Sequence, residues 1–235
     1  MKDKKIKNKP PLRYRGRLSP AQIASGINAA HANAKRLVID SAIMLAAERY
    51  PSASALAILA IEEAGKEKIL RQLAISTSDA QVVKAWKDFR DHAKKNTHWQ
   101  EFVRILLNGP FKVNLPPLSA EEAMLPSIIE DVKQLCIYTD FEFIGEEHWS
   151  EPERLVSKEG ASKFVQMAQI VVGMLHVCSV REIELYIEYL AGHALQSEED
   201  LKTALVVLWD ALQAEGLVAG GKNLMREGTG SGLDS

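Results

Sequence analysis

The stretch from residue 53 to residue 66, Ala-Ser-Ala-Leu-Ala-Ile-Leu-Ala-Ile-Glu-Glu-Ala-Gly-Lys, joins small apolar residues directly to charged ones. Apolar residues at spacings of three and four predict a closely packed helix over about residues 52–74. In that helix Glu63 and Lys66 fall in a row of leucines, where an unpaired charge is costly to bury. We therefore expect both side chains to have a structural partner or a chemical role. We expect Glu62, on the neighbouring row, to be less buried.

A second helix is expected over residues 79–107, because this stretch contains neither Gly nor Pro. Its apolar row is interrupted by His92 and Asn96. The short connection between the two helices favours antiparallel packing. The charged pair of the first helix is then expected within contact of His92 or Asn96 in the same chain, lining a cleft or a buried pocket. The alternative is a hydrogen-bonded core network without chemistry.

The composition favours helices over a sheet. Of the 235 residues, 46% are hydrophobic but only 6% are aromatic, and Ala and Leu are abundant. We expect an all-α fold, a bundle of about six helices with at most one short β-hairpin, at residues 138–149. The remaining helices are expected at residues 20–50, 119–136 (kinked near Pro126), 158–195 and 197–215.

Positive charge is concentrated at the start of the chain. Residues 1–17 carry eight Lys or Arg against one Asp, and the totals of 29 basic and 31 acidic residues leave 21 and 30 for residues 18–235. We divide the chain into a basic disordered arm (1–18), one helical domain (19–215) and a flexible Gly-rich tail (216–235). The arm lacks the apolar stretch of a secretory signal. It is either a solvated terminus or a contact for nucleic acid or an acidic partner.

The sequence predicts no membrane span, because its most apolar candidate, residues 164–180, contains two Gln and one His. Cys136 and Cys178 lie in apolar surroundings without the spacing of metal ligands. A phosphate-binding Gly loop, a nucleotide fingerprint and a nucleophile elbow are also missing from the sequence. We therefore expect a cytoplasmic protein with buried, reduced thiols that uses no metal or cofactor.

Several segments, taken in their order along the chain, resemble the abortive-infection V (AbiV) family of bacterial phage-resistance proteins, which belongs to the HEPN superfamily of small helical bundles. The resemblance runs from about residue 21 to residue 152, and more loosely to residue 195. The segments that carry it are Asn33-Ala-Lys-Arg-Leu37, the Ala-Leu-Ala-Ile-Leu-Ala-Ile-Glu-Glu-Ala-Gly-Lys stretch, Trp86-Lys-Asp-Phe-Arg-Asp-His-Ala-Lys-Lys95 and Lys133-Gln-Leu-Cys-Ile-Tyr-Thr-Asp-Phe141 with Trp149 and Pro152.

The resemblance implies a HEPN-like dimeric bundle that acts against phage. Many HEPN proteins are metal-independent ribonucleases that use an Arg, four to six intervening residues and a His. This chain departs from that pattern, because seven residues separate Arg90 from His98 and only one separates Arg90 from His92. Lys87 has the right spacing from His92, but Lys lacks the planar fork of Arg. Whether the chain is an enzyme therefore stays open.

Three functions are compatible with these observations. The first is an antiviral effector that acts by binding a phage or host component, with a phage protein as the candidate partner. The second is a metal-independent ribonuclease with an atypical HEPN site and RNA as its partner, and the third is a helical scaffold. A homodimer is expected because the apolar rows exceed what one domain needs. The candidate catalytic residues are His92, Arg90 and Glu63, and the candidate binding residues are Lys66, Lys95, Asn96 and His98.

Overall fold

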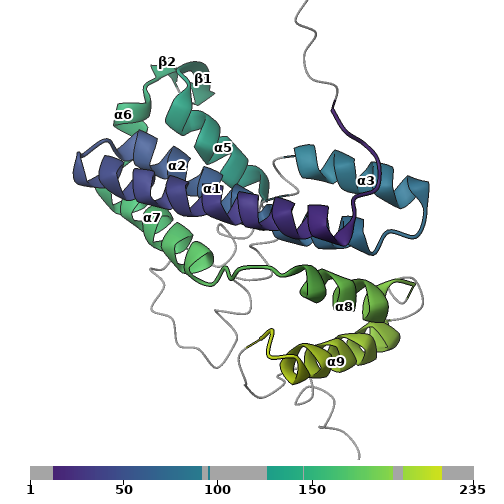
Figure 1. The fold of residues 1–235 in the computed structure, drawn as a ribbon. Helices are drawn as coiled ribbons and strands as arrows, with labels where there is room; N and C mark the ends of the chain where they lie inside the picture. Colours follow the sequence, from purple (N-terminus) through teal and green to yellow (C-terminus); the bar gives the residue numbers. More distant parts are fainter. Residues whose placement is uncertain (1–12, 92–94, 96–125, 145, 193–197, 219–235) are drawn as a thin grey trace, which may run out of the picture.

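Two long antiparallel helices, α1 (Pro20–Ala46) and α2 (Tyr50–Ala74), form the centre of the computed structural model (Figure 1). The structure describes residues 13–91, 95, 126–144, 146–192 and 198–218. The start of α1 follows from a capping box. The Ser19 hydroxyl accepts a hydrogen bond from the Gln22 amide, 3.3 Å away, and the Gln22 side chain accepts one from the Ser19 amide, 2.9 Å away.

The other elements surround this helix pair. Helices α3 (Asp79–Arg90) and α5 (Pro126–Ile137) pack against α2, and α5 is followed by the strands β1 (Asp140–Ile144) and β2 (Glu146–Ser150) and the short helix α6 (Pro152–Leu155). Helices α7 (Lys158–Gly173) and α8 (Val180–Leu190) each pack against both α1 and α2. Helix α9 (Glu198–Ala214) packs against α8. The predicted all-α fold with one hairpin is confirmed. The described ranges hold eight helices rather than about six.

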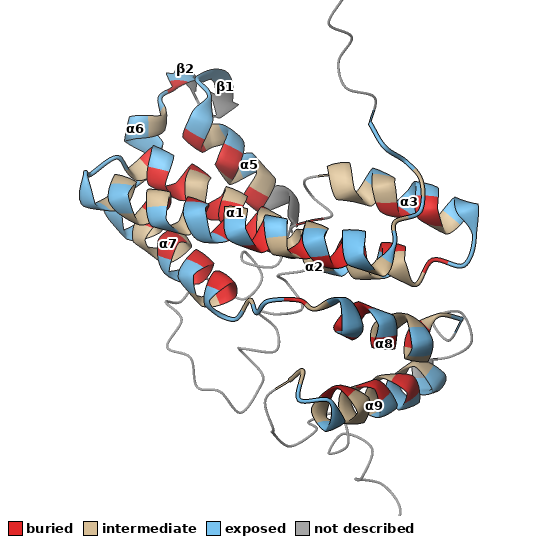
Figure 2. Ribbon diagram, viewed as in Figure 1, coloured by how far each residue is buried: buried red, intermediate tan, exposed pale blue. Residues whose placement is uncertain are grey.

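The helix pair is covered by apolar packing at both ends (Figure 2). Toward one end, alanines of α2 let α1, α5 and α7 approach closely, and Ala53, Ala57 and Ala60 are fully buried there. Toward the other end, Ile23 and Ile27 of α1 and Leu70 of α2 pack with residues of α3 and α8. A third apolar cluster joins α8 to α9. Helix α2 therefore contributes to the first two of these cores.

The second predicted helix is shorter than expected. Helix α3 ends at Arg90, and Asp91 has an extended backbone with φ −88° and ψ 118°. The Asp91 carbonyl accepts a hydrogen bond from the Lys95 amide at 3.3 Å. The prediction of one uninterrupted helix through residue 107 is therefore wrong at Asp91. Residues 92–94 and 96–107 lie outside the described part.

The helix predicted over residues 158–195 is also divided in two. Ser179 caps α8 by accepting a hydrogen bond from the Glu182 amide at 3.0 Å. The connection from α7 is held by Asn28 of α1, whose side chain donates to the Cys178 carbonyl at 2.8 Å and accepts from the Cys178 amide at 2.9 Å. Because these hydrogen bonds come from a distant helix, the local apolar pattern could not predict that the helix is interrupted between α7 and α8.

The predicted hairpin is confirmed. Strands β1 and β2 pair antiparallel, with Phe141 opposite Trp149. The two rings meet edge to face with their centroids 5.3 Å apart. In the part of the chain that the structure describes, no helix has the length and apolarity needed to cross a membrane.

Both cysteines are buried as free thiols, as predicted. Burial raises the pKa of Cys136 to about 11 and that of Cys178 to about 12. Neither thiol is therefore activated as a nucleophile at neutral pH. The domain boundaries expected at residues 18 and 216 stay predictions.

Candidate functional site

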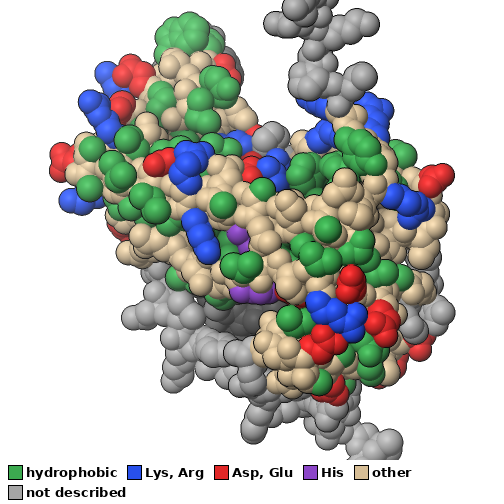
Figure 3. All heavy atoms as spheres, in the orientation of Figure 1, with side chains coloured by type: hydrophobic (Ala, Val, Ile, Leu, Met, Phe, Trp, Pro, Cys, Tyr) green, Lys and Arg blue, Asp and Glu red, His purple; other side chains and the backbone are tan. Residues whose placement is uncertain are grey.

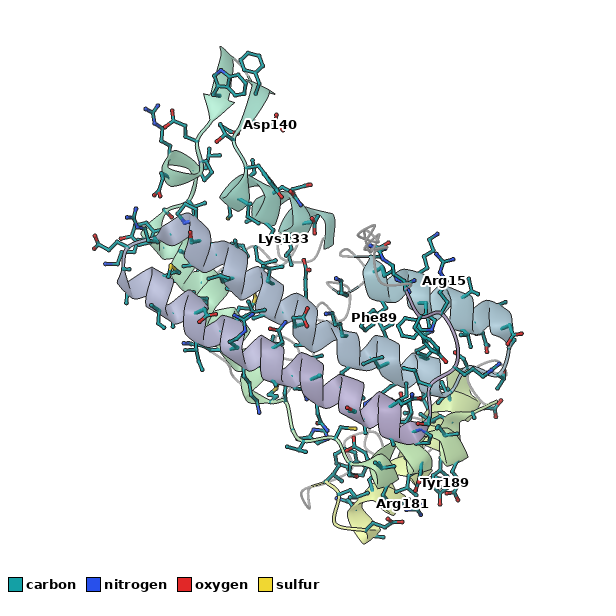
Figure 4. All side chains as sticks on the ribbon, turned by 45° about the horizontal axis from the view of Figure 1, so that its top comes forward. Arg15, Phe89, Lys133, Asp140, Arg181 and Tyr189 are labelled. Atoms are coloured by element: carbon teal, nitrogen blue, oxygen red, sulfur yellow. The ribbon has the colours of Figure 1, made fainter. Side chains whose placement is uncertain are left out.

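The carboxylate of Glu62 lies at the centre of a buried ion cluster between α2 and α5. Glu62 is only 2% exposed. Its Oε1 atom is 2.7 Å from the Nζ atom of Lys133, which reaches it from α5 (Figure 4). Lys133 also lies 2.7 Å from the carboxylate of Glu130. The charges therefore alternate in sign, which is how a buried carboxylate becomes tolerable.

A second lysine approaches Glu62 from the segment after α3. The Nζ atom of Lys95 is 3.8 Å from the Oε2 atom of Glu62, and both side chains are buried. Burial lowers the pKa of Lys95. The negative charge of Glu62 acts against this lowering, and the positive charge of Lys66 adds to it. At Lys133, burial also lowers the pKa, but hydrogen bonds to Glu130 and Glu62 outweigh burial and raise it. The environments of the two lysines therefore differ.

Gly65 explains how the chain at Lys95 comes this close to α2. A Cβ atom at position 65 would overlap the backbone carbonyl oxygen of Lys95. Glycine is unfavourable within a helix, but at position 65 only glycine leaves room for the Lys95 backbone. In the Glu-Glu-x-Gly-Lys sequence, Glu62 and Gly65 thus hold the segment at residue 95 and helix α5 against α2.

Glu63 and Lys66 pair with each other one turn apart on α2, with side chains 18% and 19% exposed. The Lys66 ammonium also lies 5.4 Å from the centre of the Phe89 ring. The expectation that Glu62 would be less buried than these two residues is wrong. Glu62 shares its face with buried Ile58 and Ile69, and the lysine on α5 compensates its charge.

The remaining predicted site residues divide into two groups. Arg90 lies on α3, where its guanidinium donates to the carbonyls of Trp86 at 2.9 Å and Tyr14 at 2.8 Å. His92, Asn96 and His98 lie outside the described residues. The predicted contact of Glu63 and Lys66 with His92 or Asn96 therefore stays a prediction, while Lys95 of the same segment does reach the cluster on α2.

The sequence reasoning missed a second ion cluster, centred on Arg71. Its guanidinium binds Glu67 one turn earlier on α2, with Nε 2.8 Å from Oε1, and Glu182 of α8. The half-exposed His176 ring lies 3.2 Å from the same Glu182 carboxylate. Arg71 also stacks 5.2 Å from the ring of Tyr186. This cluster joins α2 to α8, and only the Glu67 and Arg71 spacing of four residues was visible in the sequence.

His31 of α1 completes the Arg71 cluster. Its Nδ1 atom is 3.0 Å from the His176 carbonyl oxygen and its Nε2 atom is 2.8 Å from the Glu67 carboxylate. Both ring nitrogens thus face oxygen atoms, and His31 links Glu67 of α2 to the backbone at His176. Figure 3 shows histidine side chains near the middle of α1, beside the connection from α7 to α8. Histidine in the apolar row of the first helix was the signal that could have pointed to this cluster.

The two clusters differ from a metal centre in their chemistry. Lysine and arginine cations neutralise the buried carboxylates in both. Among the described residues, no three His, Cys, Asp or Glu side chains are grouped so that they could hold a metal ion. The two clusters can hold α5 and α8 in position against α2. Lys66, beside the Glu62 cluster, lies next to Phe89 of α3.

Comparison with known proteins identifies a family. A family model described as AbiV, of the HEPN type, matches residues 22–173. This span begins near the start of α1 and ends with α7, so it contains the whole Glu62 cluster, whereas α8 and α9 follow it. No curated protein and no solved structure matches the chain.

We expect Glu62→Gln to lower the free energy of unfolding by about 3 kcal/mol, because it leaves the buried Lys133 ammonium without its carboxylate. Glu63→Gln is the matched control, and we expect it to cost less than about 1 kcal/mol, since its pair with Lys66 is partly exposed. Urea unfolding of both variants at neutral pH measures the difference. Equal losses for the two variants would contradict the assignment of Glu62 as the buried member.

The Arg71 cluster predicts a dependence of stability on pH. Burial alone would raise the pKa of Glu67, but the His31 hydrogen bond and the Arg71 charge outweigh it and lower the pKa from 4.5 to about 2. A carboxyl with a lower pKa in the folded state stabilises the fold above its unfolded pKa. That contribution, about 3 kcal/mol, disappears as the pH falls from about 5 to about 2.

Urea unfolding between these pH values measures the loss. Glu67→Gln should remove this part of the pH dependence, whereas Glu153→Gln, at an exposed carboxylate, should leave it in place. An unchanged pH profile in Glu67→Gln would show that Glu67 does not provide it.

Proposed function

Since the chain belongs to the AbiV family of the HEPN superfamily, we propose that it protects bacteria by abortive infection and acts by binding a phage or host component. A phage protein is the candidate partner. We further propose that it works in the cytoplasm, as a homodimer, without a metal or cofactor. The family match, which covers α1 to α7, supports the defence role.

One observation favours binding over catalysis. Arg90 is the last arginine before His92 and His98 in the sequence, and a ribonuclease of this superfamily would direct such a group at phosphate. In the structure two of its nitrogens instead donate to the carbonyls of Trp86 and Tyr14. Arg90 therefore joins α3 to the segment before α1, which is a structural task.

A metal-independent ribonuclease is the second candidate. The observation that favours it is the approach of three cations to one region of α2 and α3. Lys66 stacks on Phe89, Arg90 stacks on Trp86, and the two rings meet at 5.5 Å, while Lys95 lies on the same side of α2. In this version His92 moves the proton, Glu63 assists it, and Lys66 and Arg90 hold the phosphate, with Asn96 and His98 as further binding residues.

Phage plaque assays test the proposal. Cells that express the wild-type chain should show fewer plaques than cells with an empty vector. Glu63→Gln and His92→Ala should abolish this protection although the variants stay folded by circular dichroism, and Lys35→Ala, at an exposed site on α1, should retain it. Loss of protection only in proportion to lost folded protein would support the scaffold function instead.

Incubation of the purified chain with total RNA in EDTA separates the two candidates. Binding without catalysis predicts intact RNA with both the wild type and His92→Ala. Degradation by the wild type and not by His92→Ala would establish the ribonuclease. Absence of protection by a well-expressed, folded wild type would contradict the antiviral role.

A further inference from the structure

Side-chain hydrogen bonds at three places fix the segment before α1 against α3 and against the turn that precedes α3. The Trp86 indole donates to the Gly16 carbonyl at 2.8 Å. Arg90 donates to the Tyr14 carbonyl at 2.8 Å, and Arg17 donates to the Ser76 carbonyl at 2.5 Å. We call residues 13–19 together with α3 the arm–α3 surface (Figure 1). These bonds fix the backbone of the basic segment, so its side chains are presented from a defined position.

Aromatic rings and cations alternate across the arm–α3 surface. The Tyr14 ring meets Trp86 edge to face at 6.0 Å, and Trp86 meets Phe89 in the same way at 5.5 Å. Arg90 lies over Trp86 and Lys66 of α2 lies over Phe89, each within 5.5 Å of the ring centre. Tyr14, at the outer end, is 58% exposed. Figure 4 shows Phe89 on the side of α3 that faces α2, with Arg15 nearby.

The arm–α3 surface is basic on an otherwise acidic chain. Through Asp91 it carries six basic residues and three acidic ones, whereas residues 18–235 as a whole carry 21 and 30. Arg17 pairs with Asp79 and Lys84 pairs with Asp88. Lys and Arg side chains gather where the arm meets α3 (Figure 3). Four further basic residues, Arg13, Arg15, Lys87 and Arg90, stand against Asp91, which leaves an excess of three positive charges.

We propose that the arm–α3 surface binds a single-stranded polynucleotide, with Arg13 and Arg15 contacting phosphates and Tyr14 stacking on a base. Proteins that bind single strands combine a basic track with exposed aromatic rings, because every base offers a face for stacking. An acidic protein segment would use the charges but would leave the exposed Tyr14 ring unused. The inference stands on the arm–α3 surface alone and requires neither catalysis nor the antiviral role.

The test is fluorescence anisotropy of the full chain with labelled twelve-nucleotide uridine RNA and thymidine DNA at low salt. We expect both strands to bind, since both supply phosphates and bases, and we expect binding to weaken steeply as the salt concentration rises. The double variant Arg13→Glu, Arg15→Glu should weaken binding about tenfold or more. Tyr14→Ala should weaken it about fivefold, which corresponds to the loss of one stacked base.

Two controls keep the result specific. The double variant Lys35→Glu, Lys158→Glu changes the net charge by the same amount at exposed sites on α1 and α7, and it should bind like the wild type. Equal weakening by both double variants would overturn the proposal, because it would reveal only a net-charge effect. No binding of either strand by the wild type at low salt would also overturn it. So would binding of an acidic polyglutamate peptide as tight as that of RNA and unaffected by Tyr14→Ala.

Discussion

The ion pairs of the buried Glu62 carboxylate are the interactions on which the placement of α5 and of the segment at Lys95 against α2 depends. A charge at this depth in α2 is tolerable only with opposite charge beside it, and Lys133 and Lys95 supply that charge from two other parts of the chain. Gly65, one turn further on, leaves the space that brings the Lys95 backbone against the helix. The charged motif of α2 therefore specifies which segments pack against this helix. The ion pairs offset the desolvation cost of burying Glu62, and they fix the position of α5 and of the segment at Lys95 along α2.

The Arg71 cluster likewise joins separate helices, toward the other end of α2. Arg71 joins Glu67 on its own helix to Glu182 on α8, and His31 of α1 is hydrogen-bonded into the same network. The AbiV match ends with α7, so this network connects the family domain to the two helices that follow it. Within this network the pKa of Glu67 is lowered to about 2 by His31 and Arg71, so the stability that Glu67 contributes is lost in acid.

The regular parts of this fold could be predicted from the sequence because their causes are local. Apolar spacing and the Ser19 cap place α1 and α2, and alternation places the hairpin. The choice between Glu62 and Glu63 could not be made, since neighbouring rows on a helix look alike until a partner is known. That partner, Lys133, lies 71 positions away. The Arg71 cluster was missed for the same reason: Glu182 is 111 positions from Arg71.

A double-mutant cycle between Glu62 and Lys133 tests most directly whether this ion pair holds α5 to α2. The cycle compares the free energies of unfolding of the wild type, Glu62→Gln, Lys133→Met and the double variant. Direct pairing of two buried charges predicts that the double variant is less destabilised than the sum of the single variants, by about 2 kcal/mol or more. Additive losses, with a coupling energy near zero, would contradict the central role assigned to Glu62.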